Sequence, residues 1–195
     1  MTTFVLATAN AHKADEMKAV LEGFDIVVLE RPASVPDVEE TEDTLEGNAL
    51  LKARALVDAT GHPALADDTG LFVEHLGGRP GVYSARYAGE GASYDDNVRK
   101  LLGELDGVPA SQRRASFRTV ICAAYPGGDS FSVEGVLEGS IALKPRGEKG
   151  FGYDPIFVPD LDRGRTLAEM TSEEKNAVSH RARALRALAV QLASR

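Results

Sequence analysis

The first 66 residues alternate between short apolar runs and longer amphipathic stretches, and this alternation constrains the fold more than any other feature. The runs at 4–7, 25–29 and 64–66 have the length and composition of buried strands. The two intervening stretches, 11–24 and 44–60, carry apolar residues at the spacing of one helical face. The resulting β-α-β-α-β order predicts a mixed α/β fold.

The rest of the chain continues this pattern. A capping-box sequence at 93–96 precedes a predicted helix, and 115–125 with 130–143 predict a β-hairpin. A second capping box at 171–174 opens a last helix that continues toward the end of the chain. Since no repeat or linker divides the chain, we expect a single α/β domain over 1–195, with the middle of the chain forming a second lobe.

Composition excludes several classes of protein. The 22 Lys and Arg residues against 30 Asp and Glu give a net charge of −8, which argues against nucleic-acid binding. The single cysteine, Cys122, excludes internal disulfides and CxxC zinc sites, and its apolar neighbours predict a buried thiol. No apolar run approaches the roughly 18 residues of a membrane span, and the N-terminus lacks the pattern of a signal peptide. We therefore expect a soluble cytoplasmic protein.

Several common catalytic motifs are missing from the sequence. It contains no P-loop, no GxSxG nucleophile elbow and no HExxH zinc helix. The 4 histidines show no metal-ligand spacing, and no candidate nucleophile has a visible base beside it. The remaining candidates are clusters of charged and aromatic residues.

The first cluster follows the first predicted strand. Thr8, Asn10 and Lys13 at a helix start offer backbone N–H groups, the positive end of a helix dipole and an ammonium, which together suit a phosphate. A plain strand-to-helix turn capped by Asn10 explains the same residues equally well.

The second cluster is Asp67-Asp68-Thr69-Gly70, which we expect directly after a buried strand. Two adjacent carboxylates there are costly unless a cation or a proton neutralises them. Mg²⁺ binds one or two protein carboxylates together with phosphate oxygens, and the acidic loop at 30–43 could add Glu39 or Glu40. The alternative is a turn in which an aspartate caps a helix or accepts backbone hydrogen bonds.

The third cluster is the run 151–154, Phe-Gly-Tyr-Asp, before Pro155. An aromatic ring held by a glycine turn can stack on a planar base, although the aromatic residues of such loops often only fill the hydrophobic core. Lys175, His180 and Arg181 lie on or near the first half of the last predicted helix, where taken alone they indicate its solvated face.

Five segments in order resemble one family, the inosine triphosphate pyrophosphatases, which hydrolyse deaminated purine nucleoside triphosphates (dITP, ITP, XTP) to the monophosphate and pyrophosphate. The segments are LATANAHK at 6–13, EETEDTLEGNALLKA at 39–53, ADDTGLFVEHLGGRPGVYSARYAGE at 66–90, GFGYDPIFVPD at 150–160 and AEMTSEEKNAVSHRARAL at 168–185.

The resemblance implies an α/β mixed sheet in two lobes around a deep nucleotide-binding cleft, a homodimer and a Mg²⁺ cofactor. It implies that Asp68 is the proton acceptor and a metal ligand. It assigns Glu39 as the second metal-side carboxylate, with the adjacent Glu40 as the alternative register. The substrate-binding residues that it implies are Thr8, Ala9, Asn10, Ala11, His12, Lys13, Lys52, Thr69, Phe151, Gly152, Tyr153, Asp154, Lys175, His180 and Arg181.

The chain departs from the family pattern at a few positions. Ala9 replaces a common glycine, Thr69 replaces a common serine, and Glu42 and Gly47 differ from the usual residues of their segment. A pyrophosphatase for other modified nucleotides and a non-catalytic nucleotide-sensing module remain alternatives. Two buried carboxylates argue against the sensing module, because a protein that only binds gains little from them.

Overall fold

The computed structural model describes residues 2–8, 10–162 and 164–195. The chain divides into two compact units. Unit 1 comprises Met1–Asp68, Thr119–Gly135 and Arg181–Arg195. Unit 2 comprises Thr69–Arg118 and Val136–His180.

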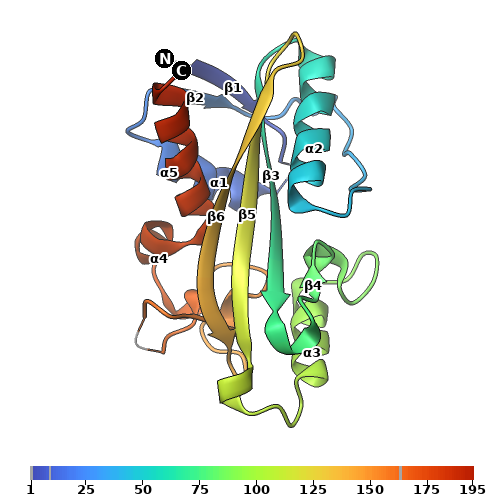
Figure 1. The fold of residues 1–195 in the computed structure, drawn as a ribbon, viewed down its shortest axis with the longest axis vertical. Helices are drawn as coiled ribbons and strands as arrows, with labels where there is room; N and C mark the ends of the chain where they lie inside the picture. The colour runs from blue at the N-terminus through green and yellow to red at the C-terminus, as the bar shows by residue number, and fades with distance from the viewer. Residues whose placement is uncertain (1, 9, 163) are drawn as a thin grey trace. The chain divides into compact units, whose positions relative to one another are not determined.

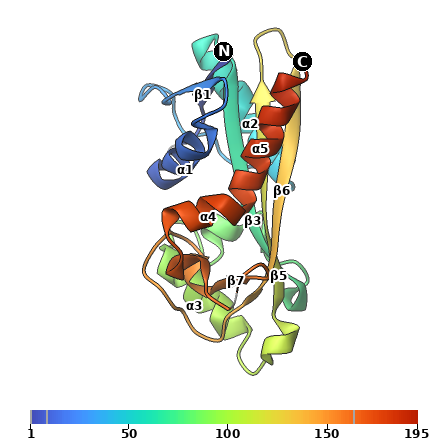
Figure 2. The ribbon, with the colours of Figure 1, turned by 90° about the vertical axis from the view of Figure 1, so that its left-hand side faces the viewer.

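The helices and strands alternate as the sequence predicts (Figures 1 and 2). The N-terminal elements, all in unit 1, are β1 (Thr2–Leu6), α1 (Ala11–Leu21), β2 (Ile26–Leu29) and α2 (Leu45–Thr60). Three long strands that continue from one unit into the other are β3 (Ala64–Val73), β5 (Arg114–Ala124) and β6 (Ser130–Ile141). The remaining elements are β4 (Pro80–Gly81), α3 (Tyr94–Glu104), β7 (Phe157–Pro159), α4 (Ser172–Val178) and α5 (His180–Ala193).

The strands form one mixed sheet with the order β2-β1-β3-β5-β6-β7, and β4 pairs with β3. β1 runs parallel to β2 and β3, with Val5 opposite both Leu29 and Ala64. β4 is antiparallel to β3, and β7 is antiparallel to β6. The mixed α/β class predicted from the sequence is therefore confirmed.

Each unit has its own apolar core. In unit 1, α1 and α5 pack on the sheet through Met17, Leu21 and Leu185, which join Phe4 and Leu65 in one buried cluster. In unit 2, the core contains side chains from α3, from the end of β3, the start of β5 and the end of β6, and from the segment that leads to α4. These two cores fix the elements that carry the charged and aromatic candidates.

Local signals of the sequence predict the helix ends well. Asn10 caps α1 by accepting a hydrogen bond from the Lys13 N–H, and Thr44 caps α2. Gly61 ends α2 in the left-handed conformation that favours glycine. Both predicted capping boxes, at 93–96 and 171–174, are present.

The strand predicted at 64–66 is longer than expected. β3 continues to Val73, so Asp67-Asp68-Thr69-Gly70 lies inside a strand and does not form a turn. The extension is stabilised by pairing with β4, where Leu71 is opposite Gly81, and by the burial of Leu71 and Val73 in the core of unit 2.

The predicted last helix is interrupted. α4 ends at Val178, Ser179 is extended with ψ at 155°, and α5 starts at His180. Val178 packs against the core of unit 2, whereas Ala182 and Leu185 belong to the core of unit 1. The apolar residues of the predicted last helix therefore pack in two different cores.

We expect Gly70→Ala to destabilise the protein. The added methyl group would lie 2.6 Å from the Gly81 carbonyl oxygen, so β4 would have to move away from β3. Overpacking of this kind costs about 1–3 kcal/mol in the free energy of unfolding, measurable by urea denaturation. Gly103→Ala in α3 is the matched control, because its methyl group meets nothing within 4 Å. Equal stability of the two variants would contradict this close approach.

Candidate active site

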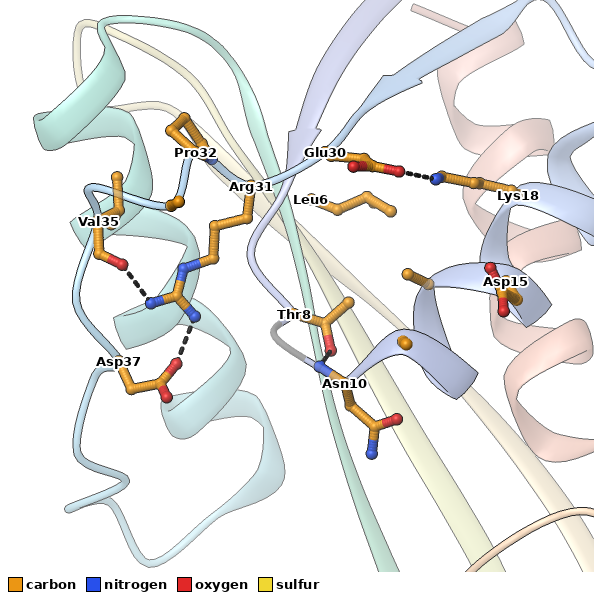
Figure 3. Close-up of a pocket in the computed structure, with 13 residues that line it drawn as sticks. Leu6, Thr8, Asn10, Asp15, Lys18, Glu30, Arg31, Pro32, Val35 and Asp37 are labelled. Atoms are coloured by element: carbon orange, nitrogen blue, oxygen red, sulfur yellow. Dashed lines mark hydrogen bonds and ion pairs between the residues drawn. The ribbon is translucent and has the colours of Figure 1, made fainter.

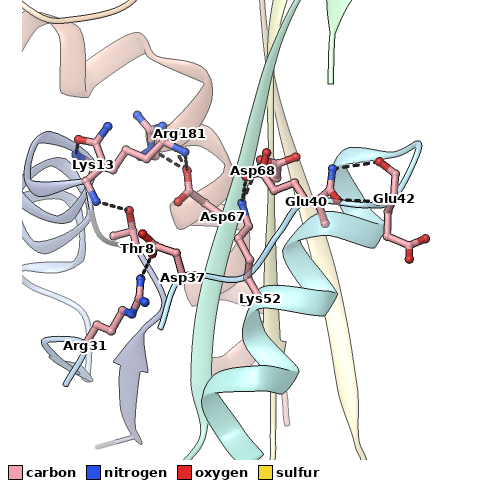
Figure 4. A network of polar contacts seen from close by, with 12 residues as sticks. Thr8, Lys13, Arg31, Asp37, Glu40, Glu42, Lys52, Asp67, Asp68 and Arg181 are labelled. Carbon is pink, nitrogen blue, oxygen red and sulfur yellow. Dashed lines mark hydrogen bonds and ion pairs between the residues drawn. The ribbon is translucent and has the colours of Figure 1, made fainter. Parts of the chain in front are cut away.

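Asp67 and Asp68 are consecutive residues of a strand, so their side chains point to opposite faces of the sheet (Figure 4). Asp67 lies on the side of α1 and α5, and Asp68 on the side of α2. Both residues are buried. Each carboxylate consequently has its own set of basic partners.

Asp67 is held by two cations. Its Oδ2 lies 3.1 Å from Lys13 Nζ and 3.2 Å from Arg181 Nη2, and the Arg181 guanidinium also pairs with Glu16. Burial alone would raise the pKa of Asp67, but the charges of Lys13, Arg181 and Lys52 outweigh it and hold the pKa well below its usual range. Asp67 is therefore a permanently ionised anchor that joins α1, β3 and α5.

Asp68 has a different environment. Its Oδ1 lies 3.0 Å from Lys52 Nζ, which in turn lies 2.9 Å from Glu40 Oε1. Its Oδ2 is buried and has no hydrogen-bond partner among the described residues. Burial, the largest effect, and the charge of Glu40 together raise the pKa of Asp68, although the charge of Lys52 opposes them. These properties suit a group that takes up a proton or binds a further cation.

The structure places Glu40, and not Glu39, beside Lys52. The Glu39 side chain is exposed, so the neighbouring residue occupies the place that the resemblance assigned to Glu39. Asn48, which is fully buried in α2, fixes this part of the loop through two hydrogen bonds with the Glu42 backbone. The role of Glu39 as a metal ligand stays a prediction that this geometry does not favour.

The two departures at Glu42 and Gly47 lie against each other. A Cβ atom at Gly47 would be 2.8 Å from the Glu42 Cβ, so a larger residue at 47 would displace the acidic loop. Gly47 therefore makes room for Glu42, and the loop that carries Glu40 keeps its place.

The turn before α1 is organised by its own side chains. The Asn10 N–H donates to Thr8 Oγ1 at 3.1 Å, and the Lys13 N–H donates to Asn10 Oδ1. Ala11 and His12 are exposed. The predicted substrate residue Ala9 lies outside the described residues.

A pocket of about 480 Å³ opens beside this turn, bounded by α1 and the loop at 30–37 (Figure 3). Arg31 lies on the loop side of this pocket, where it donates to the Val35 carbonyl and pairs with Asp37 (Figure 3). Sequence reasoning missed Arg31, whose only signal was a basic residue in an otherwise acidic loop. The pocket gives small molecules access to Thr8 and Asn10.

A second polar set lies in unit 2. Lys175 Nζ is 2.6 Å from Asp154 Oδ2, and the Phe151 N–H donates to the same oxygen at 2.8 Å. The Lys175 ammonium also lies 4.7 Å from the centre of the Phe151 ring. A Cβ atom at Gly150 would lie 2.1 Å from Asp154 Oδ2, so this arrangement needs glycine. The result is an aromatic ring beside a fixed carboxylate and ammonium.

Other candidates near this set have structural contacts. Tyr153 is buried and donates its hydroxyl to the Ser84 carbonyl. His180 stacks on Phe117 at 4.7 Å. Tyr94, which sequence reasoning missed, lies 6.0 Å from the Phe151 ring. Gly152 has a positive φ of 63°, and Thr69 lies in β3 next to Asp68.

Arg181 is the candidate whose position differs most from the expectation. It was grouped with the residues around Phe151, but its guanidinium is bound by Asp67 and Glu16 in unit 1. Because these carboxylates engage it in a fully buried position, they favour a role in anchoring Asp67, and the contact of Arg181 with the base stays a prediction.

Two features are absent from the described residues. No group of three or more His, Cys, Asp or Glu side chains there is arranged to hold a metal ion on its own. None of the helices in the described part of the chain combines the length and the apolar character that a membrane span requires.

A family model described as the Ham1 family matches residues 4–191. The chain belongs to the Ham1 family. A dITP/XTP pyrophosphatase from a Thermoanaerobacter species is 51% identical over 183 residues, which cover 93% of this chain and 91% of that protein. The Bacillus subtilis dITP/XTP pyrophosphatase is 48% identical over 190 residues, which cover 96% of both chains.

Solved structures agree with this assignment. The structure of a HAM1 protein from Coxiella burnetii matches with a TM-score of 0.90 at 43% identity, covering 100% of both chains. The family predicted from the five sequence segments is confirmed, and so is the fold class.

We expect Arg181→Met to destabilise this Ham1 protein strongly. The change removes the guanidinium that Asp67 and Glu16 share, and breaking such a buried pair costs about 3–5 kcal/mol. Arg186→Met, at an exposed position of the same helix, is the control and should change stability by less than about 0.5 kcal/mol. Chemical denaturation measures both. Similar stability of the two variants would show that the cluster around Asp67 is no anchor.

Proposed function

We propose that this chain hydrolyses deaminated purine nucleoside triphosphates such as dITP, ITP and XTP to the nucleoside monophosphate and pyrophosphate, with Mg²⁺ as cofactor. The observation that carries the proposal is Asp68, whose buried Oδ2 has no hydrogen-bond partner among the described residues and whose pKa is raised. Membership of the Ham1 family and the near full-length similarity to dITP/XTP pyrophosphatases support it.

The residues around Asp68 fit a magnesium ion. Carboxylate oxygens of Asp68 and Glu40 are the ligands that Mg²⁺ prefers, and Mg²⁺ fills its other positions with water and phosphate oxygens. Two carboxylates therefore suffice where a triphosphate supplies further ligands. When bound, the ion supplies charge that stabilises pyrophosphate as a leaving group.

The other steps belong to the chain itself. Asp68 orients a water molecule toward the α-phosphorus and accepts its proton, which its raised pKa favours. Lys13 and Lys52 neutralise phosphate charge, and the N–H groups at the start of α1 donate to phosphate oxygens. Asp67 stays ionised and keeps Lys13 in place.

The set around Phe151 suits the base. The Phe151 ring stacks on the purine, a contact worth about 1–3 kcal/mol that every base shares. Discrimination must come from hydrogen bonds, for which His180 and Lys175 can donate to the 6-keto oxygen. Adenine presents an amino group there, so a donor of the protein would be left unpaired at a cost of about 1–3 kcal/mol.

The proposal extends to assembly and location. We propose a cytoplasmic homodimer, for which light scattering after gel filtration should give twice the mass of the chain.

The function is tested by pyrophosphate release from ITP, GTP, ATP and dTTP, each with and without Mg²⁺. We expect release from ITP that requires Mg²⁺ and far exceeds release from ATP. Faster release from dTTP than from ITP would identify an enzyme for other nucleotides. Binding of ITP without release would identify a nucleotide-sensing module.

Asp68→Asn should retain nucleotide binding and lose most turnover. The change keeps the shape of the side chain while it removes the charge, and general-base help alone is worth roughly 10²–10⁴-fold. The kcat for pyrophosphate release from ITP at saturating Mg²⁺ measures the effect. A variant that keeps more than about a tenth of the wild-type kcat would refute the assignment of Asp68.

Substitutions of Glu40 and Glu39 should differ in their effect on the Mg²⁺ requirement. Glu40→Gln should raise the Mg²⁺ concentration needed for half-maximal activity by about tenfold, because Glu40 shares Lys52 with Asp68. Glu39→Gln, at the exposed position, is the matched control and should leave that concentration within about twofold. The opposite pattern would restore Glu39 as the metal-side carboxylate.

Residues assigned to the base and residues assigned to the phosphates should affect different kinetic quantities. His180→Ala should reduce the ratio of kcat/KM for ITP over ATP, since it removes a donor to the base. Lys13→Ala should lower kcat/KM for both nucleotides about equally, because its ammonium serves the phosphates that they share. If Lys13→Ala changes the ratio as much as His180→Ala does, the division of roles is wrong.

A further inference from the structure

Lys52 occupies an unusual position for a residue assigned to phosphate. Its ammonium lies 3.0 Å from Asp68 Oδ1 and 2.9 Å from Glu40 Oε1, so it bridges two carboxylates of the candidate metal site. The side chains of Lys52 and Asp68 are only 14% and 6% exposed. Solvent therefore screens this cluster poorly.

The position of the Lys52 ammonium reduces the repulsion between Asp68 and Glu40. Two carboxylates that face one another in a poorly hydrated place repel, and one ammonium between them offsets part of that repulsion. A divalent ion bound to the same oxygens would offset it better, because it carries twice the charge. The ammonium and a divalent ion cannot both occupy the space between Asp68 Oδ1 and Glu40 Oε1.

We propose that Lys52 is an exchangeable internal cation, which holds Asp68 and Glu40 together in the metal-free protein and must leave them before a divalent ion binds. This inference rests on the proposed function of the site, since it takes Asp68 and Glu40 as the metal-side carboxylates. Asp68 Oδ2, buried and without a hydrogen-bond partner among the described residues, belongs to the same carboxylate as the Oδ1 that the ammonium contacts, so an ion bound to this carboxylate would lie against the ammonium.

The exchange makes metal and nucleotide depend on each other. Without nucleotide, a divalent ion must displace the ammonium from both carboxylates that it contacts, and the ammonium then needs another anion. A triphosphate supplies that anion, so the ammonium can move to a phosphate oxygen as the ion binds. Lys52 therefore weakens the binding of metal alone and favours the binding of both ligands together.

The test is the affinity of the nucleotide-free protein for Mn²⁺, measured from the spectrum of free Mn²⁺ by electron paramagnetic resonance. We expect Lys52→Met to bind Mn²⁺ about tenfold more tightly than the wild type, because the competing cation is gone. Lys13→Met is the matched control: it removes the same charge from the other side of β3, where Asp67 is its partner. It should change the Mn²⁺ affinity by less than about threefold.

Two outcomes would overturn the proposal. If Lys52→Met binds Mn²⁺ no more tightly than the wild type, the ammonium does not compete with the ion. If Lys13→Met gains as much affinity as Lys52→Met, net charge explains the effect. Lys52→Gln, which keeps a polar end, replaces Lys52→Met where circular dichroism shows that the methionine variant fails to fold.

A double variant separates this inference from the proposed function. Adding Asp68→Asn to Lys52→Met should abolish the gained Mn²⁺ affinity. A gain that survives in the double variant would place the ion elsewhere, which contradicts the proposed metal site itself. A gain that never appears, in a protein whose pyrophosphatase activity still depends on Asp68 and Mg²⁺, contradicts only the exchange.

Discussion

The candidate site depends on how two adjacent carboxylates of β3 are neutralised. A buried aspartate without a partner would either take up a proton or unfold the strand. Here Lys13 and Arg181 keep Asp67 ionised, and Lys52 pairs with Asp68. These three basic residues come from α1, α5 and α2, so the helices of unit 1 are tied to the strand through the charges that the chemistry needs. The ion pairs that stabilise the fold thus also set the protonation of the site.

The neutralisation is unequal, and the inequality gives each aspartate its own role. Lys13 and Arg181, both within hydrogen-bond distance, lower the pKa of Asp67 in spite of its burial. Burial raises the pKa of Asp68, because its one lysine is shared with Glu40 and offsets the burial only in part. A carboxylate that two cations keep ionised serves to hold other groups in place. An under-compensated one can still accept a proton or a metal ion, and so reactivity falls to the second residue of the pair.

Much of this arrangement could be predicted from the sequence, and the failures have physical reasons. Helix caps such as Asn10 and the capping box at 171–174 depend on residues a few positions away, so local patterns predicted them. The length of β3 depends on pairing with β4, and the position of Arg181 depends on Asp67, which lies 114 positions earlier; neither relation is visible locally. Glu42 and Gly47 lie so close that a Cβ atom at position 47 would meet the Glu42 side chain, a relation that neither residue alone reveals.

The register of β3 determines which face of the sheet each of the two aspartates lies on. Successive side chains of a strand alternate between faces, so a slip by one residue would place Asp68 opposite Arg181 and Asp67 opposite Lys52. The parallel pairing of Leu6 with Leu65 and the antiparallel pairing of Leu71 with Gly81 fix the strand on both sides of the motif. Leu65 and Leu71, which are fully buried in different cores, would both have to leave them for the slip to occur. Apolar packing several residues away therefore assigns the chemistry of the charged pair, because it alone distinguishes two otherwise identical side chains.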